Sequence, residues 1–297
     1  MKKIYQFFFG NSVQNPEFLI FLRISVGIIL LIHLLSLGSD FSNLYGIDKT
    51  LPTDIQTYNL TSNVFYYDNI VYFFSNILNI SVASSEVLYY SIFCILCILI
   101  IVGFFSRLSA FLLLFLQIGL IKSSYFYTYG VDFFCSMSLF YLVLLPSDDY
   151  YSLRRKVFKN FNKAGNLTPF RRLMQIHLCW AYGVSGIEKL SGYNWRNGES
   201  IWKALHLPSF ENPFIESINY LGQFPWIFVI SGWIIIIIEL LYPFFINLRK
   251  TRKIWLYLTI LMHFFIALFL NLYFFSAIMI VWNITNFYFE DKNKIQD

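Results

Sequence analysis

Lys189 is the residue whose type and position are best suited to chemistry in this chain. It closes an apolar stretch, directly follows Glu188, and precedes an aromatic, glycine-containing loop that carries Trp195. A charge near the end of a membrane-spanning segment is costly unless it has a partner or a task. Loss of hydration favours the neutral amine over the ammonium, so a buried lysine can act as a base near neutral pH.

The residues around Lys189 predict a small polar pocket. Positions at helical spacing before Lys189 fall on its own face of the helix, and their side chains can hydrogen-bond an amine or a ligand. A histidine of another apolar stretch lies toward the same side of the membrane. The predicted pocket consists of Gln175, Tyr182, Ser185, Trp195 and His33. The alternative interpretation is that Lys189 is a membrane anchor whose amine reaches the headgroups.

Four further ionisable residues predict a polar layer inside the bundle. They are Arg23, His177, Glu239 and His263. Counted at about 1.5 Å per residue, each lies roughly 7–14 Å from the cytoplasmic end of its helix. Three interpretations stay open: a structural network in which Arg23 pairs with Glu239, a proton path or ligand site, and a metal or haem site. No metal site is predicted, because these residues lack the local spacing of metal ligands.

Composition places all these residues in a membrane protein. Of the 297 residues, 57% are hydrophobic and 13% are charged, and the mean hydropathy is +0.58. No soluble domain of this size needs so much apolar surface. We therefore predict an all-α, polytopic helix bundle in the lipid bilayer. Its eight predicted spans are residues 18–37, 87–103, 108–124, 131–145, 170–190, 224–246, 254–270 and 273–289.

The distribution of basic residues predicts the orientation of these spans. With the N- and C-termini in the cytoplasm, 16 of the 22 basic residues fall on the cytoplasmic side and four on the outer side. This bias follows the positive-inside rule. The sixteen are Lys2, Lys3, Arg107, Arg154, Arg155, Lys156, Lys159, Lys163, Arg171, Arg172, Arg249, Lys250, Arg252, Lys253, Lys292 and Lys294. The prediction is a plasma-membrane protein whose Lys189 pocket faces the extracytoplasmic side.

Residues 1–297 are expected to form one transmembrane domain. Within it, residues 191–223 are predicted to form an extracytoplasmic amphipathic lid of two short helices, the first capped by Asn197 and the second by Asn212. Residues 65–80 are apolar but interrupted by polar side chains, which is typical of a helix lying along the membrane surface. The basic cytoplasmic loop lacks interleaved aromatic residues, so no nucleic-acid partner is predicted.

Several short motifs carry a family resemblance when they are taken in order. The central pair is GIEKL at 186–190 followed by WRNG at 195–198. Supporting segments are NLYGIDKTLP at 43–52, GFFSRLS at 103–109 and ELLYP at 239–243. Together they resemble the horizontally transferred transmembrane domain family, which includes the membrane part of vitamin K-dependent γ-carboxylase. The rich content of Ile, Phe, Asn, Lys and Tyr fits a short bacterial member.

The resemblance implies two different functions. In γ-carboxylases the lysine of this motif is the base that deprotonates a reduced quinone on the lumenal side, and the matching residue is Lys189. This implies an enzyme acting on a quinone or another lipid-soluble ligand; no defined cofactor follows from the residues. Short bacterial members include accessory proteins that mature or export a secreted toxin peptide of the sporulation-delaying type, so the partner would be a secreted peptide or a small accessory protein. A transporter is a weaker alternative, because no internal repeat is present.

Overall fold

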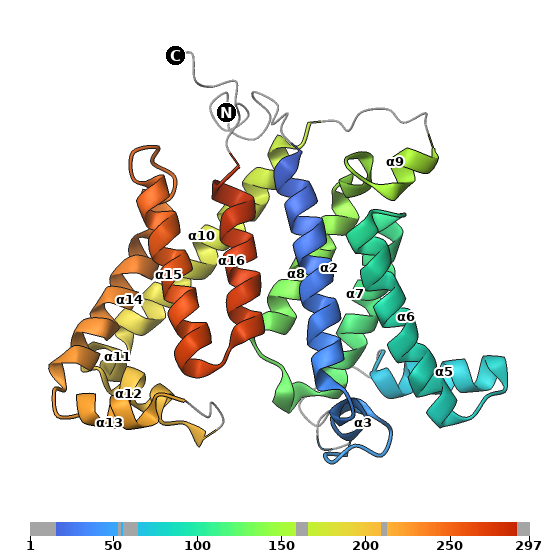
Figure 1. The fold of residues 1–297 in the computed structure, drawn as a ribbon, viewed down its shortest axis with the longest axis horizontal. Helices are drawn as coiled ribbons and strands as arrows, with labels where there is room; N and C mark the ends of the chain where they lie inside the picture. Colours follow the sequence, from blue (N-terminus) through green and yellow to red (C-terminus); the bar gives the residue numbers. More distant parts are fainter. Residues whose placement is uncertain (1–15, 53–54, 56–64, 159–165, 209–212, 290–297) are drawn as a thin grey trace. The chain divides into compact units, whose positions relative to one another are not determined.

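The computed structural model of the chain describes residues 16–52, 55, 65–158, 166–208 and 213–289. Every regular element within these ranges is helical, which confirms the predicted all-α class (Figure 1). Contacts between the helices group into two compact units. One unit is residues 19–165, and the other is residues 1–18 together with 166–297.

Five helices are long and apolar enough to cross a membrane, which confirms the predicted class of membrane protein. They are α2 (Glu17–Leu37), α6 (Val82–Val102), α7 (Ser106–Ser123), α14 (Trp226–Phe245) and α15 (Arg252–Leu270). Two shorter apolar helices are α8 (Gly130–Leu144) and α16 (Tyr273–Phe287). The 24-residue α10 (Thr168–Ser191) is long enough, but it carries Arg171, Arg172, Glu188 and Lys189. These last three helices make up the rest of the eight predicted spans.

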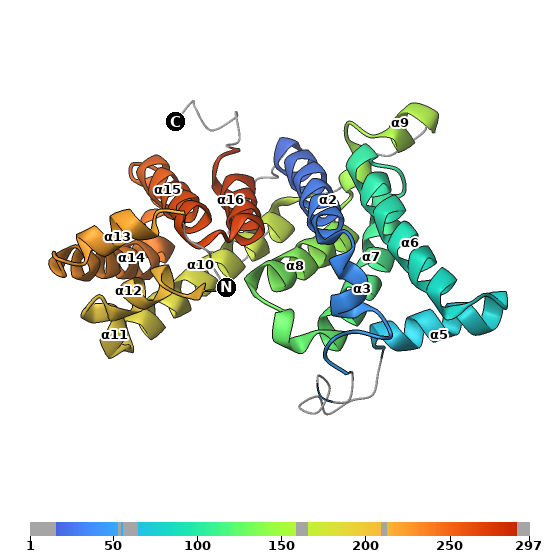
Figure 2. The same cartoon turned by 60° about the horizontal axis from the view of Figure 1, so that its bottom comes forward.

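In the unit of residues 19–165, α6, α7 and α8 pack against one another in sequence order. The short elements are α3 (Asp40–Tyr45), α5 (Tyr67–Leu78), η1 (Tyr125–Tyr127), η2 (Ser147–Asp149) and α9 (Leu153–Val157). Figures 1 and 2 show α5 lying across the end of α6 rather than along it. The rings of Tyr67 and Tyr89 meet edge-to-face at 4.7 Å and fix this crossing. Such an orientation suits the predicted helix at a membrane surface.

At the opposite end of the same unit, a glycine determines how α6 ends. Helix α6 ends at Gly103, whose φ of +73° is a left-handed conformation that favours glycine. A Cβ at this position would lie 2.6 Å from the Cβ of Ser152 and would collide with the guanidinium of Arg23. Glycine therefore both ends the helix and leaves room for the buried Arg23 side chain.

In the other unit, α10 packs most extensively against α14, and α15 forms a hairpin with α16. Three short helices connect α10 to α14: α11 (Tyr193–Arg196), α12 (Glu199–Leu205) and α13 (Ile215–Leu221). Helix α11 packs on α14, and α12 packs on both α14 and α15. The segment after α10 thus returns along the helix that α10 already contacts.

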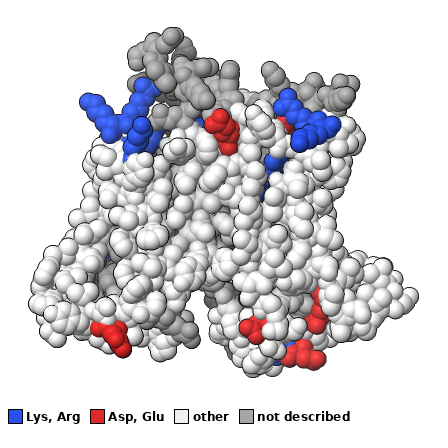
Figure 3. All heavy atoms as spheres, viewed as in Figure 1, with Lys and Arg blue, Asp and Glu red and all other residues white. Residues whose placement is uncertain are grey.

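Basic side chains gather at one end of each unit (Figure 3). In residues 19–165, basic side chains gather over α9, and acidic side chains lie at the end that carries α3 and α5. In residues 166–297, basic side chains gather over the turn from α14 to α15, and acidic ones at the end with α12 and α13. A helix bundle with one basic end is typical of membrane proteins with a cytoplasmic positive side.

Candidate functional site

The amine of Lys189 is held by three protein groups. Its Nζ donates hydrogen bonds to Oε2 of Glu239 at 2.7 Å and to Oγ of Ser185 at 2.5 Å. It also lies 5.0 Å from the centre of the Trp195 ring, within the range of a cation–π interaction. The side chains of Lys189 and Glu239 are 17% and 9% exposed. Two of the predicted pocket residues, Ser185 and Trp195, therefore do contact Lys189.

Close packing of α10 on α14 places Lys189 against Glu239. A Cβ at Gly186 would lie 2.5 Å from the backbone nitrogen of Leu240, so only glycine fits at this point. A Cβ at Gly198 would lie 2.6 Å from the backbone of Phe228. The chain from 186 to 198 is thus held against successive turns of α14. This fixed register of α10 on α14 brings the amine of Lys189 to hydrogen-bonding distance of the carboxylate of Glu239.

The contact also corrects the predicted depth of Lys189. Glu239 comes about 13 residues after the first residue of α14, roughly 20 Å along its axis. Lys189 therefore meets α14 well past its midpoint and not near Trp226, the end of α14 that the sequence predicts to lie on the outer side. The reason is that α10 ends early and the chain continues along α14 as α11 and α12. Residue counting assumed that neighbouring helices end at one level.

A proline lies one turn beyond the carboxylate on α14. Pro243 has no backbone N–H, so it cannot give the hydrogen bond that the carbonyl of Glu239 would receive in a regular helix. The Cγ of Pro243 faces Gly183 of α10, 3.3 Å from where a Cβ would stand. The backbone around Glu239 is therefore locally released from the regular helical ladder while α10 covers it.

Tyr182 belongs to a second polar cluster, not to the Lys189 pocket. Its hydroxyl lies 2.7 Å from Nε2 of His263 and accepts a hydrogen bond at 2.8 Å from the amide of Asn283. The hydroxyl of Tyr242 donates to Oδ1 of the same Asn283 at 2.7 Å. Tyr182 precedes Lys189 by two helical turns, roughly 10 Å along α10. The prediction that Tyr182 serves the amine is wrong, because a buried amide recruits its hydroxyl instead.

Two other predicted pocket residues also lie elsewhere. The amide nitrogen of Gln175 donates to the backbone carbonyl of Asn286 at 2.7 Å, and its oxygen accepts from Arg172 at 2.8 Å. Gln175 shares a helical face with Lys189 but is four turns away. His33 belongs to the unit of residues 19–165, where it lines a cavity with Asp132. Of the five predicted pocket residues, Ser185 and Trp195 are the ones in contact with the amine.

The predicted pairing of Arg23 with Glu239 is also wrong. The guanidinium of Arg23 donates to three backbone carbonyls, those of Ser147 at 2.6 Å, Tyr150 at 3.3 Å and Tyr151 at 2.8 Å. The carboxylate of Glu239 is taken by Lys189. The equal predicted depth of Arg23 and Glu239 on separate helices did not make them partners. The donors of Arg23 bind backbone carbonyls instead.

The two histidines of the predicted layer lie in the same unit but have different surroundings. His177 packs edge-to-face on the ring of Trp282, with 5.3 Å between ring centres. His263 is 2% exposed and bonds to Tyr182. The four residues therefore do not form one layer: Glu239 joins Lys189, His263 joins Tyr182, and Arg23 is held within its own unit.

The predicted lid is helical in its described residues. Helix α12 begins at Glu199 with Gly198 at the N-cap position, one residue after the predicted cap Asn197, whose Oδ1 accepts from the backbone N–H of Glu199 at 3.0 Å. The second helix starts at Ile215, later than predicted, and the predicted cap Asn212 lies outside the described residues. The ring of Trp202 packs on His206 with 3.8 Å between ring centres. A hydrogen bond from Lys203 holds the pKa of Glu199 below its ordinary value.

Sequence reasoning missed Asn283, the centre of the second cluster. Asn283 is fully buried and bonds to both Tyr182 and Tyr242. The signal was available, because an amide in the middle of a 15-residue apolar helix must find partners inside the protein. Among the described residues, no group of three or more His, Cys, Asp and Glu side chains converges as a metal ion would require.

Comparison with known proteins found no match. Neither a family model, nor a curated protein, nor a solved structure resembles the chain at a significant level.

Proposed function

We propose that this protein is a membrane enzyme of the γ-carboxylase type, in which Lys189 is a base that acts on a quinone or another lipid-soluble ligand. The observation that carries the proposal is the 2.7 Å hydrogen bond between Lys189 and Glu239. A carboxylate at this distance does more than hold the ammonium. It is also a group that can accept its proton.

The chemistry follows from the low polarity of the surroundings. Separated charges are less favourable in an apolar interior than in water, so the pair can become a neutral amine and a neutral carboxylic acid. The proton passes from Nζ of Lys189 to Oε2 of Glu239. The free amine then takes the hydroxyl proton of a reduced quinone, which leaves a quinol anion beside the new ammonium. Trp195 supplies an aromatic face at the amine.

Arginine at position 189 tests the role of Lys189 as a base. Guanidinium stays protonated in proteins, so Lys189→Arg keeps the charge but removes the base. Reduced menadione is added without oxygen to protein in lipid nanodiscs, and the absorbance of the quinol anion is recorded. The wild type should bind the quinol and form the anion. The arginine variant should bind it without forming the anion.

Lys49→Arg is the matched control for this experiment. Lys49 also pairs with a carboxylate, Asp68 at 2.9 Å, and its side chain is 1% exposed. Lys49→Arg shows whether replacing lysine by arginine in a buried ion pair outside the site harms the protein. The signal of the quinol anion should persist in this variant. An anion signal of full strength in Lys189→Arg would contradict the proposal, as would a wild type that does not bind the quinol.

A second function is favoured by the saturation of the Lys189 amine. Ser185, Glu239 and Trp195 already occupy its surroundings, as expected for a purely structural joint between α10 and α14. In this alternative the protein is a non-catalytic accessory that helps mature or export a secreted toxin peptide. Lys189→Arg would then leave peptide release into the medium nearly unchanged, and the wild type would not bind the quinol.

The proposal places the site in an eight-span protein of the plasma membrane, with both termini in the cytoplasm and Lys189 reached from the outer side. Support comes from the charge bias of the sequence and from the basic end of each unit. Reporter cysteines test it in a background without the native Cys94, Cys97, Cys135 and Cys179. Asn194→Cys should react with an impermeant thiol reagent in intact cells, and Asn166→Cys should not; both positions are exposed. The reverse pattern would overturn the orientation.

A further inference from the structure

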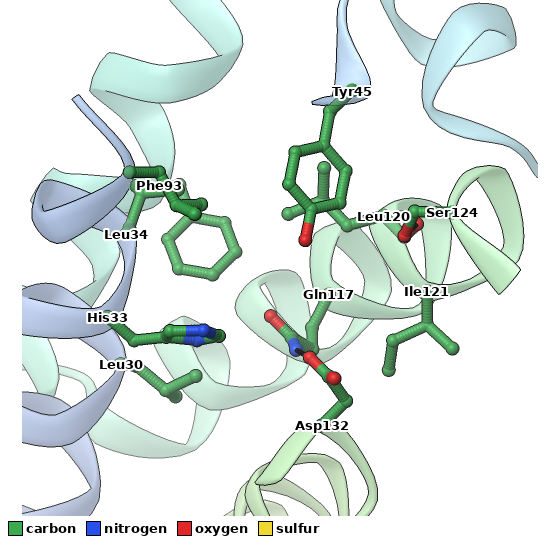
Figure 4. Close-up of a pocket in the computed structure, with 11 residues that line it drawn as sticks. Leu30, His33, Leu34, Tyr45, Phe93, Gln117, Leu120, Ile121, Ser124 and Asp132 are labelled. Carbon is green, nitrogen blue, oxygen red and sulfur yellow. Dashed lines mark hydrogen bonds between the residues drawn. The ribbon is translucent and has the colours of Figure 1, made fainter. Parts of the chain in front are cut away.

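A small polar cavity lies inside the unit of residues 19–165, independent of the Lys189 site. Its volume is about 20 Å³, enough for one water molecule. Five helices, α2, α3, α6, α7 and α8, and the short segment after α7 contribute to its wall, and its polar side chains face one another across it (Figure 4). The polar lining residues are His33, Tyr45, Gln117, Ser124 and Asp132.

The carboxylate of Asp132 has unused acceptor capacity in this cavity. Its Oδ2 accepts the backbone N–H of Tyr129 at 3.1 Å, and its Oδ1 accepts the amide of Gln117 at 3.3 Å. The residue is 8% exposed. A carboxylate can accept about four hydrogen bonds. Even with its own backbone N–H as a third protein donor, the carboxylate has room for a further donor on the cavity side.

His33 and Tyr45 face the carboxylate from two other helices. Figure 4 shows the His33 ring extending from α2 toward Gln117 and Asp132, and the Tyr45 hydroxyl entering the cavity from α3. Burial, and then the charge of Asp132, raise the pKa of Tyr45 to about 12. The phenol therefore stays protonated at neutral pH and is available as a hydrogen-bond donor. The imidazole of His33 is then the group that can exchange a proton with the carboxylate.

We propose that this cavity holds one water molecule and that His33, the water and Asp132 share one bound proton, so that the pair is neutral overall. An ionised carboxylate enclosed by apolar helices is costly unless a counter-charge or a proton accompanies it. Histidine and aspartate together can carry that proton on either partner. The other titratable side chains around the pair are thiols and phenols, uncharged at neutral pH: Tyr45 of α3, Tyr129 just before α8, Cys135 of α8, and Cys97 of α6. Gln117 is the uncharged contribution of α7.

The location of the proton can be measured directly. The chain has four histidines, so ¹⁵N-histidine NMR in lipid nanodiscs resolves each ring, and His33→Gln assigns the signal of interest. Infrared difference spectra between wild type and Asp132→Asn report a protonated carboxyl. At pH 7 the wild type should show either an imidazolium at His33 or a carboxylic acid at Asp132. Asp132→Asn should abolish whichever signal is present.

Asparagine has nearly the shape of aspartate and keeps the contact with Gln117, so the fold should survive the exchange. Should it not, His33→Gln tests the same pair from α2. His177→Gln is the control, because His177 packs on Trp282 and should leave both signals unchanged. A neutral His33 beside an ionised Asp132 at pH 7 would overturn the proposal. So would an empty cavity in a cryo-EM map that resolves other buried waters.

Discussion

Arg23 and Lys189 are two cations within long helices, and the structure neutralises them in different ways. Arg23 is 1% exposed and donates to three backbone carbonyls of the turn that follows α8. The side chain of Lys189 is 17% exposed, and its amine contacts one carboxylate, one hydroxyl and one aromatic ring. Carbonyl oxygens cannot take a proton at neutral pH, whereas a carboxylate can.

The partner therefore decides what each cation can do. Arginine offers five donors in a fixed fork and does not lose its charge, which suits it to bind a turn of backbone carbonyls. Arg23 therefore stabilises the turn and cannot exchange a proton with its partners. In the proposed mechanism, by contrast, the lysine and the glutamate exchange a proton, and a ligand shifts that balance. The two sites therefore differ in whether the partner of the cation can accept a proton.

Loss of Arg23 should have the largest effect on stability. Arg23→Leu leaves the buried carbonyl of Ser147 and the partly buried carbonyls of Tyr150 and Tyr151 without their donors. We expect a loss of about 3–6 kcal/mol in the free energy of unfolding, since each unsatisfied buried group costs about 1–3 kcal/mol. Thermal unfolding in detergent measures it. Arg23→Lys should be intermediate, because one ammonium cannot reach all three carbonyls. A leucine variant as stable as wild type would show that the turn does not depend on the guanidinium.

Loss of Glu239 should have the next largest effect. Glu239→Ala leaves the ammonium of Lys189 largely unpaired, which we expect to cost about 2–4 kcal/mol, somewhat less than for a fully buried pair because Lys189 is partly exposed. Lys189→Met with Glu239→Ala should cost less than the sum of the single changes by about 1–3 kcal/mol. Arg23→Leu with Glu239→Ala should be additive, because these two residues have separate partners. Additivity for Lys189 and Glu239 would show that the ion pair does not contribute to stability.

The class of the fold and most helix positions could be predicted from the sequence. In a membrane, a long apolar stretch must satisfy its backbone hydrogen bonds internally, which a helix does. Hydropathy therefore predicts elements such as residues 18–37, observed as α2 (Glu17–Leu37). The start of α6 was placed five residues late. Its first turn is polar and is held by Ser81, which accepts from the backbone N–H of Ser84 at 3.1 Å. Hydropathy does not detect such a cap.

Side-chain partners were predicted less well, for a physical reason. Helical periodicity gives the face of a residue, but contacts between helices depend on how closely their backbones approach and where each helix ends. Gly186 sets the register of α10 on α14, and no pattern in the sequence states which residue it meets. The carbonyls that hold Arg23 carry no side-chain signal at all. Only Ser185 and Trp195, close to Lys189 in the sequence, could be assigned correctly.

A methyl group at Gly186 should have the smallest effect on the free energy of unfolding. This effect should be confined to the packing of α10 on α14. Gly186→Ala places Cβ about 2.5 Å from the backbone of Leu240, so α10 and α14 must separate. We expect a loss of about 1–3 kcal/mol, as for other overpacked interiors. Gly183→Ala is the control: its Cβ would meet only Cγ of Pro243 at 3.3 Å, and the better helix propensity of alanine offsets a mild clash.

These two glycines also test whether the ion pair depends on the backbone register. If α10 shifts in Gly186→Ala, the coupling between Lys189 and Glu239 in the double-variant cycle should fall, while in Gly183→Ala it should persist. Arg23 lies in the other unit, so the cost of Arg23→Leu should be the same in both backgrounds. Unchanged coupling in Gly186→Ala would mean that the long lysine side chain adapts to the shift. The amine and the carboxylate would then hold each other without the close helix contact, unlike Arg23, whose partners are fixed backbone carbonyls.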